Sequence, residues 1–453
     1  MKCCLGLVGM SLLAGGAVPA KAQTSVTIYN DGRLLERRVL PNRLPGGSSN
    51  HRLALGALDL GSVFALDSGV TITGASYDAT TDELSTLRRS IGQRITFVNR
   101  HPTGGVDTVV AEVLGTDPER YRLPDGRITF LRPGTALYSS ELVQLEPTLT
   151  VAVASDQPRS TLGVGFFSAG APWSANYSVV LGPRNVARIT GAAVIGAFPK
   201  RIENAEVQLL AGEVGRANKN RMVGDQMLLR ASAAPSREVA GEQQVGEAHL
   251  YSLPGRLALL PGVETSAMLF EPGTAPFERT FTVTGQLPYW GGLPQYGDES
   301  NDPVNVAYVI KRPLKTQFGD RPIPGGTVRI YDRDVQGRPQ LIGESSLGHT
   351  AAGQDLRLDA GTAFDLTAKR LQTAYETHPE GKRTVATAVY AIVLSNAKDS
   401  EATVDVLEQR GGEWSVLQSS IPAEKVSSTI TRFRVRVPAK GQATLSYRVR
   451  VIW

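Results

Sequence analysis

Strict alternation of apolar and polar side chains over short stretches is the feature that most limits what this chain can fold into. It recurs in VTIYN from Val26, RITFVNR from Arg94, LTVAVASD from Leu149 and NVAYVI from Asn305. Successive side chains of a strand point to opposite faces, so this period predicts strands with one buried face. The 47 glycines and 27 prolines suit many turns. We therefore expect an all-β, mainly antiparallel protein of several β-sandwich or small β-barrel modules.

One or two short helices are expected among these strands. The first lies in TTDELSTLRRSIG, where a capping box, helically spaced apolar residues and a stop signal follow one another: Thr80 with Glu83, then Leu84, Leu87 and Ile91, then Gly92. The segment from Phe364 to His378 fits a helix or a strand, and its pattern leaves both open.

The first residues, MKCCLGLVGMSLLAGGAVPAKA, resemble a secretory signal peptide. Lys2 precedes an apolar run from Cys3 to Val18, and an A-x-A sequence ends at Ala22. The run is too short to span a bilayer as a helix. We expect cleavage after Ala22 and export to the periplasm, cell surface or medium.

The chain after Ala22 has no cysteine, because Cys3 and Cys4 both lie in the signal segment. Disulfides and thiol chemistry are therefore excluded for the processed chain. Of the 48 lysines and arginines, two belong to the signal, which leaves 46 against 43 acidic residues. This near balance argues against a nucleic-acid partner, and no apolar run of 18 residues predicts a transmembrane helix.

Length and composition shifts predict three β domains after the signal peptide at 1–22. The first covers 23–155 and includes a small barrel-like module. The second covers 156–290 and contains a mobile loop at 216–247, which is polar and without a sustained period. A segment rich in Pro, Gly and Asp, Gln286 to Asn305, separates it from the third domain at 303–453.

Several sequence blocks together resemble a bacterial secreted family catalogued as domain of unknown function 4139, some members of which are labelled mucoidy-inhibitor-like. They include YNDGRLLERRVLPNRLPGG near the start, TLGVGFFSAGAPWSANYSVVL in the middle and VPAKGQATLSYRVRV at the end. The most specific block runs from PIPGGTVRIY to AGTAFDL. The resemblance covers most of residues 24–453. It implies an exported, β-rich envelope protein and carries over no catalytic residue.

The stretch APWSANYSVVLG offers a candidate binding site in Trp173, Asn176 and Tyr177. Trp173 and Tyr177 alternate with polar residues, so they fall on one side of a strand. Aromatic side chains there fill the core of a sandwich or form a platform for a ligand. We favour the core, with the tyrosine hydroxyl bonded to a partner.

Two hairpins are predicted near the C-terminus. In the first, Val404 and Val406 lie on one arm of a Gly411–Gly412 turn, and Trp414 and Val416 lie on the other. In the second, TRFRVRVPAKGQATLSYRVRVIW, five arginines are expected on one face: Arg432, Arg434, Arg436, Arg448 and Arg450. Such a row binds an anionic glycan, lipid headgroup or acidic envelope protein, or is a solvated face with acidic neighbours, which we favour. The terminal aromatic residue also suits the last strand of an outer-membrane barrel, a weaker alternative.

No catalytic, cofactor or metal motif is complete. GFFSAG lacks the glycine that a nucleophile elbow needs two places before Ser168, and the histidines are scattered. Asp332 and Asp334 of DRDVQG partly match a calcium loop, but a hairpin turn explains them better.

We therefore expect no cofactor and a non-catalytic structural or binding protein of the cell envelope. The alternative is an envelope hydrolase that acts on glycan or peptide through carboxylates brought together by the fold. The oligomeric state is left open by the sequence.

Overall fold

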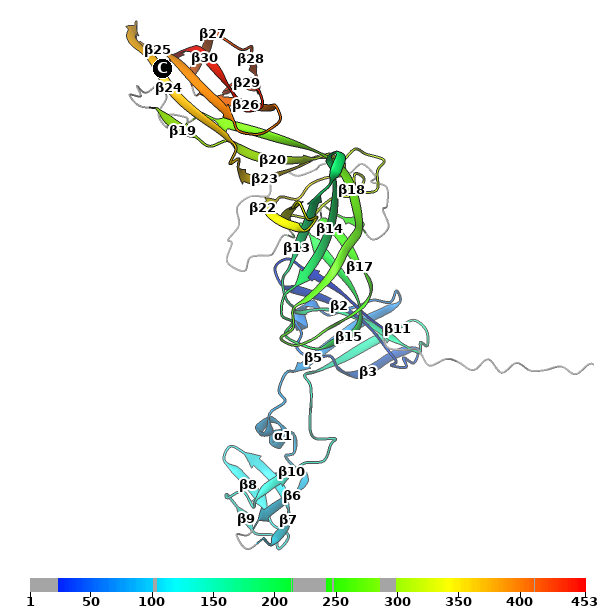
Figure 1. Ribbon diagram of the computed structural model, residues 1–453. Coiled ribbons are helices and arrows are strands. Elements are labelled where there is room, and N and C mark those ends of the chain that lie inside the picture. The colour runs from blue at the N-terminus through cyan, green and yellow to red at the C-terminus, as the bar shows by residue number, and fades with distance from the viewer. Residues whose placement is uncertain are drawn as a thin grey trace, which may run out of the picture. The chain divides into compact units, whose positions relative to one another are not determined.

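The computed structural model describes residues 23–100, 104–212, 214, 242–246, 248–285, 299–410 and 412–453. The expected signal peptide therefore lies outside the described residues. Strands dominate, with one α-helix, α1 (Glu83–Arg89), and two 3-10 turns, Leu60–Ser62 and Pro183–Asn185, in this part of the chain (Figure 1). The expected all-β, mainly antiparallel fold class is confirmed. No helix in the described ranges is long and apolar enough to cross a membrane.

The chain divides into two compact units that each combine distant segments. The first comprises Met1–Pro172, Gly196–Leu209 and Gly255–Glu264, and the second comprises the rest. The boundaries expected near residues 155 and 290 do not coincide with this division. Residues 149–153 and 162–166 share one core, so the chain does not change domain between them.

The first unit contains twelve complete strands. They are β1 (Gln23–Tyr29), β2 (Arg33–Leu40), β3 (Gly47–Ala54), β4 (Phe64–Ala65), β5 (Val70–Asp78), β6 (Arg94–Arg100), β7 (Val106–Thr116), β8 (Glu119–Arg122), β9 (Ile128–Thr129), β10 (Thr135–Leu137), β11 (Thr148–Ser155) and β12 (Leu162–Ala169). Two further strands, β15 (Ile202–Ala211) and β17 (Ala248–Leu259), contribute residues to both units.

The larger core of the first unit lies between two sheets. One sheet has the order β16-β17-β15-β1-β2-β12-β4, and the other has the order β3-β11-β5. Alternate residues of β11 and the apolar residues of β12 are buried between them, including Val151, Val153, Val164 and Phe166. The alternation in the sequence thus corresponds to a sandwich interior.

A smaller core belongs to the five-stranded sheet β10-β6-β7-β8-β9 and to α1. Phe97 and Tyr121 pack edge to face there, with ring centroids 5.1 Å apart. The barrel-like module expected in this region is not formed, because the sheet stays open and no described sheet closes on itself. The predicted helix is confirmed, but Asp82 caps it by accepting a hydrogen bond from the Ser85 amide, in place of the expected Thr80.

Glu119 is expected to make the stability of this small sheet depend on pH. Arg132 donates hydrogen bonds to both oxygens of Glu119, at 2.6 and 3.0 Å, and these bonds lower the pKa of the carboxyl below its usual 4.5. The stabilisation is therefore present above pH 4.5 and is lost as the pH falls through the lowered pKa. Glu119→Gln is expected to flatten this acid dependence in thermal unfolding from pH 6 to about 2. An unchanged slope would exclude this pair as its source.

The second unit holds the remaining strands. They are β13 (Trp173–Leu181), β14 (Val186–Ile195), β16 (Glu242–Val245), β18 (Thr265–Thr284), β19 (Ser300–Asp302), β20 (Asn305–Ile310), β21 (Gly326–Arg333), β22 (Pro339–Leu347), β23 (Leu356–Thr362), β24 (Leu366–Glu380), β25 (Arg383–Asn396), β26 (Ala402–Gln409), β27 (Glu413–Ser419), β28 (Ala423–Lys425), β29 (Ile430–Val437) and β30 (Gly441–Ile452). The segment Phe364 to His378, for which helix and strand were both open, is thus a strand from Leu366 onward. The mobile loop expected at 216–247 is mostly outside the described residues, and its end forms β16.

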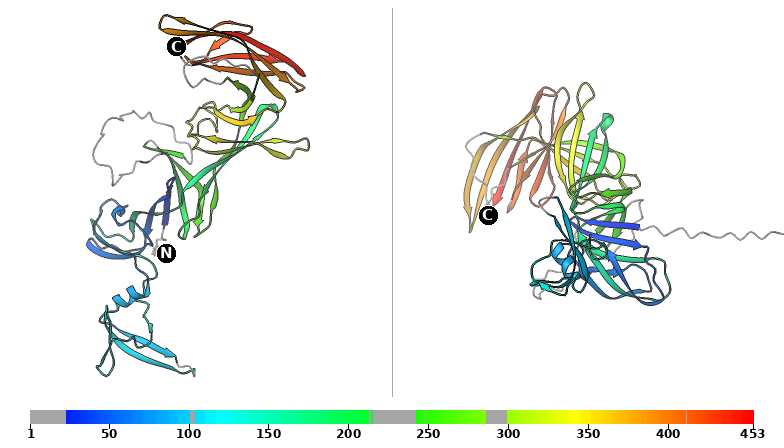
Figure 2. Two further views of the ribbon diagram at one scale, coloured as in Figure 1. Left: turned by 90° about the vertical axis from the view of Figure 1, so that its left-hand side faces the viewer. Right: turned by 90° about the horizontal axis from the view of Figure 1, so that it is seen from below.

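Apart from β16, the strands of the second unit form a ten-stranded sheet and a five-stranded sheet. The first has the path β22-β21-β13-β14-β18-β26-β29-β28, with β20 paired to β18 and β23 paired to β20. The second has the order β19-β24-β25-β30-β27. Two pairs, β13 with β21 and β18 with β26, are parallel. The strands from Leu366 onward, orange to red in Figure 2, belong to a sandwich with one apolar core between the two sheets.

Both predicted C-terminal hairpins are wrong. β26 pairs with β29, whereas β27 and β30 pair with each other in the facing sheet. The turn from Pro438 to Gly441 therefore carries the chain from one sheet to the other. The rings of Phe433 and Tyr447 stack across the core with centroids 5.1 Å apart. Backbone pairing with distant strands, which a local pattern does not reveal, decided this arrangement.

A chain of buried charges lies at one end of this core. Glu408, on β26, accepts a hydrogen bond of 2.6 Å from Arg370 and pairs with Arg410 at 3.0 Å. Arg370 also pairs with Asp302 at 2.6 Å. Burial, reinforced by Glu408, raises the pKa of Tyr447 well above its usual value. Opposite charges alternate along this chain, from Asp302 through Arg370 and Glu408 to Arg410.

Candidate functional site

Trp173 and Tyr177 fill the core of the second unit, as favoured from the sequence. Their exposed fractions are 6% and 3%. Trp173 Nε1 donates to the Leu210 carbonyl at 3.2 Å, and the Tyr177 hydroxyl donates to the Pro324 carbonyl at 2.7 Å. Asn176 lies on the other face of β13 and accepts a hydrogen bond from Arg329 at 3.4 Å. The three residues therefore do not form a common surface.

Two sets of contacts hold the segment that contains Pro324: the pairing of Gly326 with β13 and the hydrogen bonds of Arg312. Gly326 pairs with Ala175, and a Cβ at Gly326 would lie 2.1 Å from the Ala175 carbonyl oxygen, so only glycine fits. Arg312 is fully buried and donates to the carbonyls of Phe318, Arg321, Ala351 and Gln354. The PIPGG block thus has a structural role in holding the loop.

Asp332 and Asp334 lie at the turn between β21 and β22, and the preferred hairpin is confirmed. Asp334 accepts hydrogen bonds from the amides of Gln336 and Arg338, both at 2.9 Å. Its carboxylate therefore holds the turn. Within the described ranges, no group of three or more His, Cys, Asp or Glu residues is placed to hold a metal ion.

Ser168 of the GFFSAG stretch lies within β12 and not at a strand-to-helix turn. Its hydroxyl donates to the fully buried carboxylate of Glu36 at 2.5 Å. Arg38 and Lys200 also contact this carboxylate. The contacts balance one buried negative charge with two cations and a hydroxyl.

The five C-terminal arginines do not share a face. β29 carries Arg432, Arg434 and Arg436 on the outside of one sheet, and β30 carries Arg448 and Arg450 on the outside of the facing sheet. This corrects the single arginine face expected from a hairpin. Three of the five have acidic partners, as the preferred interpretation expected: Arg432 with Glu424, Arg434 with Asp405 and Arg450 with Glu380.

One polar groove lies on the outer face of the ten-stranded sheet, and we call it the β18 groove. Its volume is about 740 Å³, within the ~300–1,000 Å³ of typical small-molecule sites. Five strands and the segments beside them line it, with Thr280, Thr282, Thr284, Asn305, Val306, Arg357, Asp359, Gly361, Asp405, Leu407, Val426, Ile430 and Arg432. It therefore includes one arginine singled out from the sequence.

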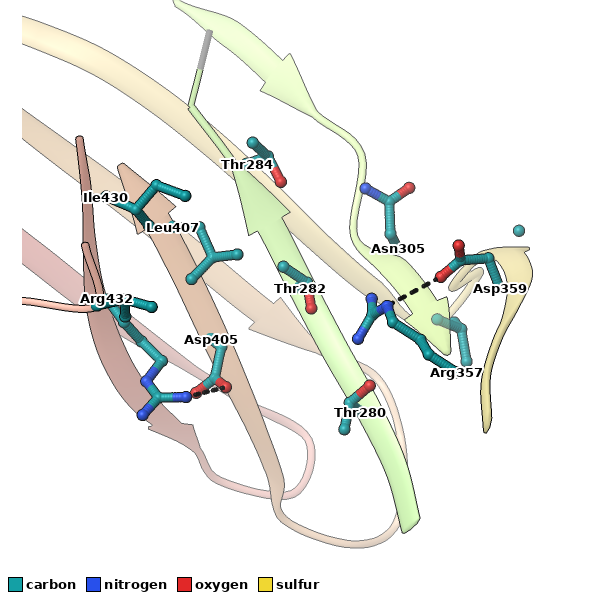
Figure 3. Close-up of a pocket in the computed structure, with 13 residues that line it drawn as sticks. Thr280, Thr282, Thr284, Asn305, Arg357, Asp359, Asp405, Leu407, Ile430 and Arg432 are labelled. Atoms are coloured by element: carbon teal, nitrogen blue, oxygen red, sulfur yellow. Dashed lines mark ion pairs between the residues drawn. The ribbon is translucent and has the colours of Figure 1, made fainter. Parts of the chain in front are cut away.

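The floor of the groove is a row of threonines on β18, with an ion pair on either side (Figure 3). Thr280, Thr282 and Thr284 follow one another on the outer side of the strand because Phe281 and Val283 between them pack into the core. The sheet register places Thr282 opposite Asn305 on β20 and opposite Asp405 on β26.

The two ion pairs are Arg357 with Asp359 at 3.3 Å and Arg432 with Asp405 at 3.9 Å. Arg432 also binds Glu424, and its hydrogen bonds lower the pKa of that carboxyl. Each groove arginine is thus accompanied by a carboxylate. The lining offers fixed donors and acceptors close together and carries no excess of charge.

Comparison of the sequence with models of protein families finds no match, and comparison with curated protein sequences finds none either. The resemblance described above therefore stays a prediction.

Sequence reasoning found Arg432 but missed the threonine row and the Arg357–Asp359 pair. The signal for the row was present in TFTVT, where threonines alternate with Phe281 and Val283. Alternation predicts that such threonines share an outer face. It does not predict which groups lie beside the threonines. The Asn305 amide comes from β20, the Arg357–Asp359 pair from β23 and the Arg432 guanidinium from β29, and a local pattern in β18 does not reveal these neighbours.

Proposed function

We propose that the protein is exported and acts as a non-catalytic binding component of the cell envelope, with the β18 groove as its ligand site. The observation that carries this proposal is the threonine row between two arginine–carboxylate pairs on a well-packed sheet. Polar groups on a rigid sheet are pre-organised, so a ligand is bound without the cost of ordering a loop.

The pattern of residues 1–22, the lack of cysteine after Ala22 and the resemblance to a secreted family support the location. An exported chain without disulfides relies on burial for stability, and the described cores supply it. Polar residues on the outer face of a sheet do not contribute to its apolar core. They are either solvated or used to bind a partner. A hollow lined by fixed hydrogen-bonding groups favours binding.

Retention on envelope material tests this function. Processed protein that begins at Gln23 is expected in the soluble exported fraction and is expected to co-sediment with isolated envelope material. The double variant Thr282→Val/Asp405→Asn removes a floor hydroxyl and a charge, and it is expected to weaken retention about thirtyfold, since each lost polar contact costs roughly 1 kcal/mol.

Thr444→Val on β30 is the matched control, because Thr444 is exposed on the facing sheet, outside the groove. It is expected to leave retention unchanged. Equal retention of wild type and double variant would refute the groove as the binding site, provided that both show the same circular dichroism and unfolding midpoint.

A further inference from the structure

We infer that the β18 groove binds a neutral, hydroxyl-rich ligand, and specifically a segment of an uncharged saccharide chain. This inference rests on the proposed function and adds the chemical class of the ligand. Three properties of the groove support it: the pairing of its floor strand, the balance of its charges and the mixture of polar and apolar groups in its lining.

The floor strand is paired on both sides at its centre, at Phe281 and Thr282. Residues 277–282 of β18 pair with β20 on one side, and residues 281–284 pair with β26 on the other. Main-chain recognition of a peptide by strand addition needs an open sheet edge. A ligand over Thr282 therefore meets side chains and not free backbone groups. This suits a molecule whose polar groups are substituents of a ring.

The groove offers donors and acceptors next to each other. Guanidinium groups only donate, carboxylates only accept, and threonine hydroxyls and the Asn305 amide do both. The Arg357–Asp359 and Arg432–Asp405 pairs thus present both functions on either side of the threonine row. A sugar hydroxyl also donates and accepts, so neighbouring hydroxyls match such pairs.

The charge balance disfavours an anion. The lining contains two arginines and two aspartates, and each arginine has a carboxylate within 4 Å. A carboxylate or phosphate ligand would have to displace these partners or lie beside them. A neutral hydroxylic ligand can bridge the pairs without separating them, and so it avoids the cost of leaving a charge unpaired.

One side of the groove supplies apolar contact. Leu407, Val426 and Ile430 lie together in the lining, and Val426 is 52% exposed. A saccharide ring carries C–H groups that pack against aliphatic side chains while its hydroxyls reach the polar groups. Ligand sites commonly combine a few placed polar groups with apolar contact area in this way.

The test is calorimetric titration of the processed protein with three neutral tetrasaccharides, namely cellotetraose, maltotetraose and chitotetraose, and with anionic tetragalacturonate. At least one neutral probe is expected to bind, and tetragalacturonate is expected to bind at least fivefold more weakly than that probe. Thr282→Val is expected to raise the Kd of the binding probe about fivefold, whereas Thr444→Val leaves it unchanged.

The outcomes separate the two proposals. Binding of tetragalacturonate alone, or binding that Thr282→Val does not weaken, overturns the neutral-saccharide inference. No binding of any probe, together with envelope retention that depends on Thr282 and Asp405, overturns the ligand class but leaves the proposed function standing. Loss of both the titration signal and groove-dependent retention overturns both proposals.

Discussion

Replacing Glu408 with glutamine is expected to lower the free energy of unfolding by about 3–5 kcal/mol, the usual cost of breaking a buried ion pair from one side. The Glu408 side chain is 2% exposed, and the variant leaves the two buried cations Arg370 and Arg410 with one carboxylate, that of Asp302, in place of two. Denaturant unfolding followed by far-ultraviolet circular dichroism measures the loss.

Asp405→Asn is the matched control for this prediction. Asp405 lies on the same strand, three residues before Glu408, but on the outer face, where it pairs with the more exposed Arg434. Partly exposed pairs contribute little, so the control is expected to change stability by less than about 1 kcal/mol. A loss for Glu408→Gln no larger than that of the control would contradict the role assigned to the buried charges.

Replacing Trp173 with alanine is expected to cost about 3–5 kcal/mol, because the change removes a large buried ring and leaves a cavity. The ring is 6% exposed, and its Nε1 bond to the Leu210 carbonyl is lost as well. The same unfolding measurement applies. Trp453→Ala is the control, since that ring is 41% exposed, and a loss below about 1 kcal/mol is expected.

The outcome for Trp173 bears directly on function. A variant as stable as wild type that fails to co-sediment with envelope material would make the ring a ligand contact and would move the site to β13. A destabilised variant that still binds the β18 groove ligand supports the separation of core and site described above.

The strands were predictable because a strand with one buried face needs an apolar side chain at every second position, and this alternation is visible in the sequence. Val151 and Val153, or Phe281 and Val283, face a core at alternate positions, and their polar neighbours face out. The short helix was predictable for a similar reason. Its cap was not, because Thr80 and Asp82 both suit the role and only the local backbone places Asp82 at the helix start.

The candidate site was predictable only in part. Arg432 stands out in the sequence by alternation, yet the five-arginine face does not exist, because the Pro438–Gly441 turn joins two facing sheets and not two neighbouring strands. A turn of this length suits either geometry. The choice was made by β25 and β26, which offer backbone partners to β30 and β29.

By itself, therefore, the sequence determined which side chains of each strand avoid water, since that depends on the residue types along the strand. Only the tertiary structure decided which strands lie next to each other, because strands pair through backbone groups that are alike in every residue except proline. The β18 groove belongs to this second class: its threonines come from one strand, but its charges come from strands that meet only in the folded sheet.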